Sequence, residues 1–470
     1  MLRHRTFIVT ALLVSATTAC TTVGPDYQPP KAGDTASSGW IEPTAIGAVD
    51  LQWWHQFGDP QLTRLVEQSM ANSPDIRIAE ARLAEARANR DAVAGRQLPN
   101  VNASGTATEN RLSENGLLPT NNIPGLSRDY SLFDLGFDAS WEIDLWGRNR
   151  RSLESANARA YAALEAKRDI QIALAGEVAR SYFDLREAQA TAASARQSLA
   201  SNQALARLTS LRFEAGEASR LEAERAEAAS EANSAALSNA EAAAAAAAYR
   251  IAALMGVAPE AIVPELRDAK PIPTSPDRIL AGVRTDLLER RPDIRKAERD
   301  MAATSADIGV ATADLFPRFS LFGSLGQQAR SFGDLDSSNS TRFSIGPSFS
   351  WPIFSAGRIR AQIRAADARS DAALAAYEKA VNGALSDSES AINRFANAQA
   401  AAKAAKAALG RESKVFALAE QRLRAGEDDR LVLERARLSL IAATNANNAA
   451  LAQEGQAAAA LYKSLGGGWQ

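Results

Sequence analysis

The sequence is dominated by a tandem duplication. Residues 136–256 align with residues 346–466 at an offset of 210 positions, and an upstream block aligns at an offset of 218 positions. Between Leu211 and Ala226, nine of the sixteen residues are identical to their counterparts, which is more than shared composition explains. Such a repeat predicts one pseudo-symmetric body instead of several unrelated domains. Only the segment between Gly105 and Gly136 and its counterpart differ in length, which predicts an exposed loop there.

The amino terminus predicts export from the cytoplasm. Basic residues 3–5 precede an apolar run from Phe7 to Val14, and small residues lead up to Cys20. This pattern is typical of a signal peptide, here residues 1–19. Cys20 resembles the lipid-attachment position of bacterial lipoproteins, with Thr17 where such sites usually carry leucine, so we expect Cys20 to be the mature, lipid-bearing first residue. The alternative is ordinary signal cleavage nearby with Cys20 as a bystander. Because Cys20 is the only cysteine, an intrachain disulfide is excluded.

Two stretches in each repeat alternate between apolar and polar residues, which predicts four amphipathic strands. The clearest stretch has the apolar residues Phe133, Leu135, Phe137, Ala139, Trp141 and Ile143 and the intervening polar residues Asp134, Asp138, Ser140, Glu142 and Asp144. Its length of about 10 to 12 residues suits a tilted membrane strand. Aromatic residues at the strand bases favour a membrane interface; they are Trp141, Trp146, Trp351 and Phe354. The alternative is an antiparallel sheet with one face in water.

Long helical segments separate these strands. A helix is predicted over 75–97, and about 66 residues from Arg148 run without a Pro or Gly-rich break, which is about 100 Å of helix. A turn at Gly216 and a shorter return helix complete a hairpin, and the second repeat copies it around Gly426. We therefore assign residues 20–74 to a lipid-anchored, extended segment and the start of an equatorial region. Residues 75–256 form repeat one, 257–290 an irregular, proline-rich equatorial linker, and 291–470 repeat two.

Four strands cannot close a membrane barrel on their own. No run of about 18 uncharged apolar residues follows Cys20, so any membrane crossing must use strands. An open sheet edge in lipid leaves backbone groups unpaired, which predicts association of several copies. Two copies would supply eight strands and three would supply twelve, and the small, polar residues on one face favour the wider barrel. A formal net charge of -2 gives no reason to expect nucleic acid.

Several motifs resemble the TolC-type outer-membrane efflux proteins, and most closely the lipoprotein branch typified by OprM and NodT. They are the run from Trp141 to Arg148, its partner from Trp351 to Arg358, the segment Trp53–Pro60 and the terminal Leu465–Trp469. The resemblance covers nearly the whole mature chain. It implies a homotrimer of mixed α+β class, in which a twelve-stranded β-barrel in the bacterial outer membrane continues as a periplasmic α-helical barrel. It also implies a periplasmic adaptor and an inner-membrane transporter, often of the resistance-nodulation-division class.

The sequence contains no catalytic constellation, metal-ligand cluster or nucleotide-binding motif, so an enzyme or a cofactor is not expected. The two histidines, His4 in the signal and His55, lie outside any cluster of ligand-type residues, and we interpret His55 as structural. Function is expected at the two helical turns. The tip motif of the family matches Arg212, Gly216, Glu217, Arg220, Arg422, Gly426, Glu427 and Arg430, which the resemblance makes candidates for docking the adaptor.

Three adjacent carboxylates, Glu427, Asp428 and Asp429, follow the second glycine. Repeated around a threefold axis they would form an acidic ring, which favours cations, and the family usually carries an aspartate at the position of Asp428. The alternative is a solvated helix cap, because acidic residues also suit a helix amino terminus. The leading hypothesis is a passive exit duct for a small-molecule efflux pump. The alternatives are the channel of a type I protein-secretion system and a non-conducting periplasmic scaffold.

Overall fold

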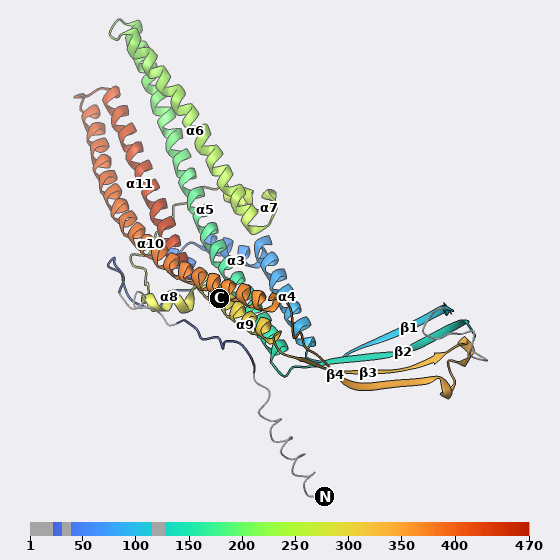
Figure 1. Cartoon of the computed structure of the whole chain (residues 1–470). Coiled ribbons are helices and arrows are strands. Elements are labelled where there is room, and N and C mark those ends of the chain that lie inside the picture. Colours follow the sequence, from blue (N-terminus) through green and yellow to red (C-terminus); the bar gives the residue numbers. More distant parts are fainter. Residues whose placement is uncertain (1–21, 31–38, 115–126, 470) are drawn as a thin grey trace. The chain divides into compact units, whose positions relative to one another are not determined.

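The computed structural model describes residues 22–30, 39–114 and 127–469 (Figure 1). The predicted signal peptide and Cys20 lie outside these ranges. The described elements are η1 (Trp53–Phe57), α3 (Pro60–Asn72), α4 (Pro74–Gly95), β1 (Asn100–Arg111), β2 (Asp129–Ile143), α5 (Arg148–Glu214), α6 (Arg220–Met255), α7 (Pro259–Leu266), α8 (Arg284–Arg290), α9 (Pro292–Ala313), β3 (Arg318–Ala329), η3 (Phe332–Asp334), η4 (Ser338–Ser340), β4 (Thr341–Ser350), α10 (Arg358–Arg424) and α11 (Arg430–Ser464).

The duplication predicted from the sequence is confirmed element by element. Helices α5 and α10 both contain 67 residues and begin at positions 210 apart. Strands β1 and β3, both of 12 residues, obey the other offset of 218. Because helix and strand bounds follow the same two offsets as the residue identities, each repeat has folded into the same series of helix, strand, strand and helical hairpin.

The four strands form one antiparallel sheet in the order β1-β2-β3-β4 (Figure 1). Consecutive strands pair, so the sheet is a simple meander with β1 and β4 at its edges. At its centre Gly136 on β2 is in register with Gly326 on β3. A Cβ on either glycine would overlap the backbone of the other strand, so the two strands approach closely at a point where no side chain fits.

The described chain separates into two compact units, each built from parts of both repeats. One unit comprises residues 1–30, 84–162 and 297–377 and contains the sheet. The other comprises residues 31–83, 163–296 and 378–470, and it contains most of α5 and α10 and all of α6 and α11. In the described ranges, no helix combines the length and the apolar character needed to cross a membrane.

The prediction of an irregular linker after Met255 was wrong in part, because this segment contains the short helices α7 and α8. In α7, Pro259 occupies the first helical position, where a missing N–H costs nothing. Pro264 lies within the helix, yet Ile262, Val263 and Leu266 are buried on one side of it. Burial of these three side chains offsets the lost hydrogen bond, and the five prolines between residues 259 and 276 concealed their pattern.

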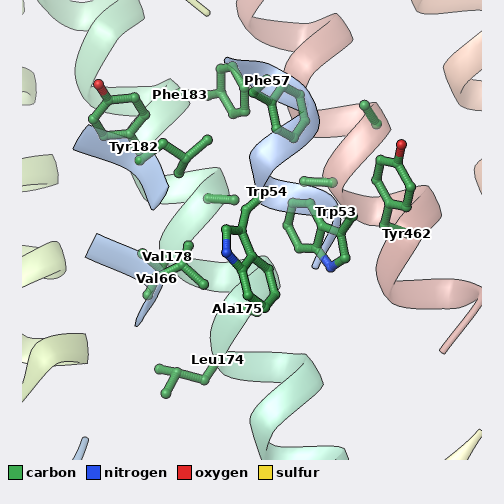
Figure 2. Close-up of a cluster of buried hydrophobic side chains, with 14 of the residues drawn as sticks. Trp53, Trp54, Phe57, Val66, Leu174, Ala175, Val178, Tyr182, Phe183 and Tyr462 are labelled. Carbon is green, nitrogen blue, oxygen red and sulfur yellow. The ribbon is translucent and has the colours of Figure 1, made fainter. Parts of the chain in front are cut away.

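The main apolar core lies in the hairpin unit, where η1 packs against α5 and α11 (Figure 2). Trp53 is fully buried and stacks on Tyr462, with ring centroids 5.4 Å apart and planes 8° apart. Phe57 meets Phe183 edge to face at 5.2 Å. The Trp-rich motif is therefore a packing element, and neighbouring His55 lies half-exposed with its Nε2 3.7 Å from Glu67.

Candidate functional site

The sheet exposes one apolar face. Large apolar side chains on it are between 57% and 78% exposed; they are Leu135, Phe137, Leu325, Phe343, Ile345 and Phe349. A patch of this kind marks contact with a membrane or another protein. The alternation predicted from the sequence is thus realised, because the polar residues between them lie on the opposite face of the pleated strands.

The opposite face of the sheet carries a charged clamp that joins β4 to β2. Arg342 donates from Nη2 to Asp134 Oδ1 at 2.5 Å and from Nε to Oδ2 at 2.9 Å. Arg342 lies opposite Gly326 in the register between β4 and β3. The guanidinium can therefore pass over β3 without meeting a side chain. Gln328 also donates to Asp134 at 2.7 Å, while Ser104 donates to the nearby Asp138 at 2.8 Å. Sequence analysis missed this clamp, because its partners lie in different repeats.

The aromatic residues predicted at the strand bases have defined partners. Trp141 donates from Nε1 to the carbonyl of Gln97 at 2.9 Å, and Trp351 makes the corresponding bond to Leu315 at 3.0 Å. Gln97 follows α4, and Leu315 follows the corresponding helix α9. Both repeats therefore have the same hydrogen bond from a tryptophan to the chain that follows this helix. Trp146 is half-buried, stacks on Phe316 and donates to Pro317, whereas Phe354 is 90% exposed. Their role at a membrane interface stays a prediction.

The two hairpin tips share one backbone geometry. Gly216 and Gly426 have φ of 71° and 74°, the left-handed region that glycine adopts without strain. The next residue in each case, Glu217 or Glu427, donates its N–H to the carbonyl of Arg212 at 2.7 Å or of Arg422 at 2.9 Å. This six-to-one bond is the Schellman termination of a helix. The repeated glycines were therefore interpreted correctly as the points where the chain reverses.

The charges at the tips differ between the repeats. Each tip has a wide arginine–glutamate pair at 3.9 Å, Arg212–Glu217 and Arg422–Glu427. Only the second tip has Asp428, whose Oδ2 accepts from Arg422 Nε at 2.5 Å. This hydrogen bond holds the pKa of the Asp428 carboxyl below its ordinary value.

Asp429 has a different task from Asp428. Its Oδ1 accepts from the N–H of Val432 at 3.0 Å and so caps α11. In the first repeat Ser219 occupies this position and caps α6 in a capping box with Glu222. The helix-cap reading of the acidic run is thus correct for Asp429, and the assignment of an acidic gate to Glu427, Asp428 and Asp429 stays a prediction.

A groove of about 270 Å³ lies between the two tips, and apolar residues and charged residues of both hairpins line it. The lining residues are Leu208, Leu211, Arg212, Ala215, Glu217, Asp429, Arg430 and Leu431. Arg220 instead lies beside Glu224, 3.5 Å away. The structure therefore brings Arg212, Glu217 and Arg430 from the predicted tip residues to one surface; the docking of an adaptor there stays a prediction.

The chain thus combines an antiparallel sheet that exposes an apolar face with two long helical hairpins that end in charged tips. No group of acidic residues, histidine or cysteine in the described ranges could hold a metal ion. Comparison with known proteins then places the chain. Residues 65–257 and 283–467 match the family described as outer membrane efflux protein. The chain belongs to this family.

The chain is similar to curated relatives over nearly its whole length. It is 30% identical to the pyoverdine export outer membrane protein OpmQ of Pseudomonas aeruginosa over 463 residues, covering 97% of this chain and 96% of the relative. It is 31% identical to the toluene efflux pump outer membrane protein TtgI of Pseudomonas putida over 454 residues, 95% of each protein. The solved structure of the outer-membrane channel OprN is 37% identical, with a TM-score of 0.83 over 95% of this chain and 99% of that one.

These comparisons confirm the predicted fold class, a trimeric twelve-stranded barrel with four strands per chain that continues as a helical tunnel. They also confirm that the chain is an outer-membrane exit duct of a tripartite efflux pump and not an enzyme. As a member of the family it works as a homotrimer with an adaptor and an inner-membrane transporter.

Proposed function

We propose that this chain is a lipid-anchored exit duct for small molecules, served by a transporter of the resistance-nodulation-division class. The observation that carries the proposal is the uncovered apolar face of a four-stranded sheet on a chain whose hairpins end in paired, charged tips. The relatives OpmQ and TtgI, named for the export of pyoverdine and toluene, support a small-molecule cargo.

Deletion of the gene tests this function. In the bacterium that carries it, loss of the duct should raise the accumulation of a small fluorescent efflux substrate as much as loss of the partner transporter does, and loss of both should add nothing. Unchanged dye accumulation with disappearance of a secreted protein from the medium would overturn the proposal in favour of protein secretion.

The anchor is expected on Cys20, which lies outside the described residues. Support comes from the signal-like sequence before it, in which small residues lead up to Cys20. Mass spectrometry of the amino-terminal peptide of the membrane-extracted protein should give the mass of a lipid-modified cysteine, and the Cys20→Ser variant should lack it. An unmodified Cys20, or cleavage elsewhere, would overturn the anchor.

The acidic ring is expected at the second tip, with three copies of Asp428 around the trimer axis. Asp428→Ala and Asp429→Ser give this tip the residues that the first tip already carries, Ala218 and Ser219, so both variants keep a helix turn and a cap of known geometry. In planar bilayers, loss of these carboxylates should lower the preference of the open channel for cations. Unchanged ion selectivity in the double variant would refute the gate. Ser219→Ala, which alters a tip without removing a charge, should leave the selectivity unchanged.

A further inference from the structure

Residues Thr22–Tyr27, here called the N-terminal strap, are held in a fixed path on the sheet unit. The N–H of Val23 donates to the carbonyl of Trp146 at 3.0 Å, directly after the end of β2. The sequence predicted that the lipid-anchored segment that begins at residue 20 is extended. The first described part of this segment is extended, but it lies against α5 and α9.

Arg151 on α5 holds most of the strap. Its guanidinium donates to the carbonyls of Val23 and Gly24 at 3.2 and 3.4 Å, and to Asp26 Oδ1 at 2.6 Å. The fourth acceptor, Glu154 at 2.8 Å, lies on its own helix. The Arg151 side chain is only 4% exposed, and a buried charge needs such acceptors. Without the strap, Arg151 would keep Glu154 alone among these four.

Glycines allow the strap to approach the helices closely. Gly24 has φ of +90° and faces Gly309 on α9, and a Cβ on either residue would overlap backbone atoms of the other segment. Gly147, with φ of +79°, similarly leaves room for Thr22. Substitution of either facing glycine would therefore displace the strap even if Arg151 were intact.

The far end of the strap is fixed as well. The Tyr27 hydroxyl donates to Glu298 Oε1 at 2.5 Å, and the Tyr27 ring packs on a small buried cluster of Ala158, Ala302 and Ala303. A segment of six residues is thus held at both ends and at its centre, through contacts with both helices.

The residues that hold the strap are not duplicated in the other repeat. At the corresponding positions of the other repeat, Arg151 is replaced by Ala361 and Gly309 by Asp91. Gly357, the counterpart of Gly147, has no neighbouring atom within 4 Å of a Cβ built there. The turn geometry is shared between the repeats, but the arginine and the glycine that receive the strap occur once per chain, so they are not a by-product of the duplicated fold.

We propose that Arg151 is a positioning residue for the mature amino terminus and fixes the point at which the lipid anchor enters the membrane. The inference rests on the proposed modification of Cys20. Thr22 lies against Gly147, between β2 and α5. Two residues of chain reach at most about 7 Å, so holding Thr22 limits how far from this point a lipid on residue 20 can enter the membrane. The anchor is then placed at the periplasmic edge of the sheet by the fold, instead of moving at the end of a loose tether.

The test uses the full-length protein in lipid vesicles, with a spin label on Gln28→Cys. A lipid-modified Cys20 has no free thiol, so the label marks the exposed residue next to the strap. Arg151→Gln should increase the mobile fraction of the label roughly tenfold, the equivalent of one lost charge-assisted hydrogen bond. Asp26→Asn, a change in an exposed side chain of the strap itself, should act in the same direction without disturbing α5. Arg159→Gln is the matched control, because Arg159 joins α5 to Asp307 without touching the strap.

The same label on Gln28→Cys also reads the depth of the chain next to the strap, through its accessibility to a lipid-soluble and a water-soluble quencher. The parent should show one depth, and Arg151→Gln a broad distribution. A Gln28 label equally immobile in Arg151→Gln and in the parent would overturn the role of Arg151. An unmodified Cys20 in the mass spectrum would instead overturn the anchor. The mobility of the Gln28 label is also compared in the Cys20→Ser background, where no other thiol can take the label, so the two failures are distinguishable.

Discussion

Gly455 on α11 is the position where one added methyl group should disturb the core most. A Cβ at this residue would overlap the ring of Phe183 on α5. Phe183 is fully buried, and its ring also packs against that of Phe57, with centroids 5.2 Å apart (Figure 2). The helix backbones cannot separate easily, because Trp53 is stacked on Tyr462 beside them. Gly455→Ala must therefore compress or expel the Phe183 ring.

The magnitude follows from two opposing effects. Expulsion of a buried phenylalanine ring costs about 3–5 kcal/mol, while replacing glycine by alanine inside a helix gains about 1 kcal/mol. Gly455→Ala should thus lower the free energy of unfolding by about 2–4 kcal/mol. Phe183→Leu, which removes the ring, should make the alanine tolerable, so the double variant should be more stable than the sum of the single effects by at least about 1 kcal/mol.

The assay is thermal and denaturant unfolding of the purified protein, followed by tryptophan fluorescence, because Trp53 and Trp54 lie in this core. Gly410→Ala is the control, since Gly410 is an exposed glycine of α10 with open space at its Cβ position; it should be neutral or slightly stabilising. If Gly455→Ala were as stable as Gly410→Ala, or if the effects of Gly455→Ala and Phe183→Leu were additive, the proposed overlap would be refuted.

Three further outcomes test the sheet and the tips. Five charged residues alternate onto the polar face of the strands, the acids Asp134, Asp138 and Glu142 and the bases Arg318 and Arg342, a net charge of -1 per chain. Arg342→Gln should change this net charge to -2 and raise the cation preference of the channel, whereas Asp134→Asn should lower the cation preference. If the two variants shifted the reversal potential equally, a clamp that faces the lumen would be contradicted. Gly426→Ala, at φ of 74°, should destabilise the second tip by about 1 kcal/mol, seen as faster hydrogen exchange there with the rest of α10 unchanged. Because the pKa of Asp428 is lowered, its pair with Arg422 stabilises the second tip at pH values above the ordinary aspartate pKa, and this stabilisation is lost as the pH falls through the lowered pKa. Amide hydrogen exchange, corrected for its intrinsic pH dependence, should then become faster at the second tip and not at the first. A parallel response of both tips would exclude the pair as the cause.

Much of the fold is predictable because it is local or repeated. The long helices follow from unbroken helical sequence, and the reversals at Gly216 and Gly426 follow from glycine beside charged, non-apolar residues. The sheet follows from strict alternation over four stretches. Each of these patterns lies within one continuous segment of the sequence, and the duplication repeats each pattern in the second half of the chain.

The contacts that could not be predicted join residues far apart in the chain. Arg186 is fully buried and donates to Gln61 at 2.5 Å, Gln189 at 2.6 Å and the carbonyl of Asp268 at 2.9 Å. Nothing in the sequence around an arginine in a long, charged helix distinguishes this one from its solvated neighbours. Only the packing of α3 and of the segment after α7 against α5 takes Arg186 out of water, and that packing has no local sequence pattern.

The strongest test of the tip interpretation uses the difference between the repeats. A trimer of duplicated chains presents six tips of one backbone geometry, yet Asp428 occurs on three of them, because Ala218 occupies its place in the first repeat. Arg212 stands as close to Glu217 as Arg422 does to Glu427, 3.9 Å in both cases. Arg212 should therefore pair with the aspartate that Ala218→Asp introduces, as Arg422 pairs with Asp428. If all six tips line the narrow end of the duct, this variant doubles the aspartates at the position of Asp428, and it should raise the cation preference as Asp428→Ala lowers it. If Ala218→Asp slows first-tip hydrogen exchange but leaves selectivity unchanged, the first tip does not face the conducting path, and the acidic ring is confined to the second tip.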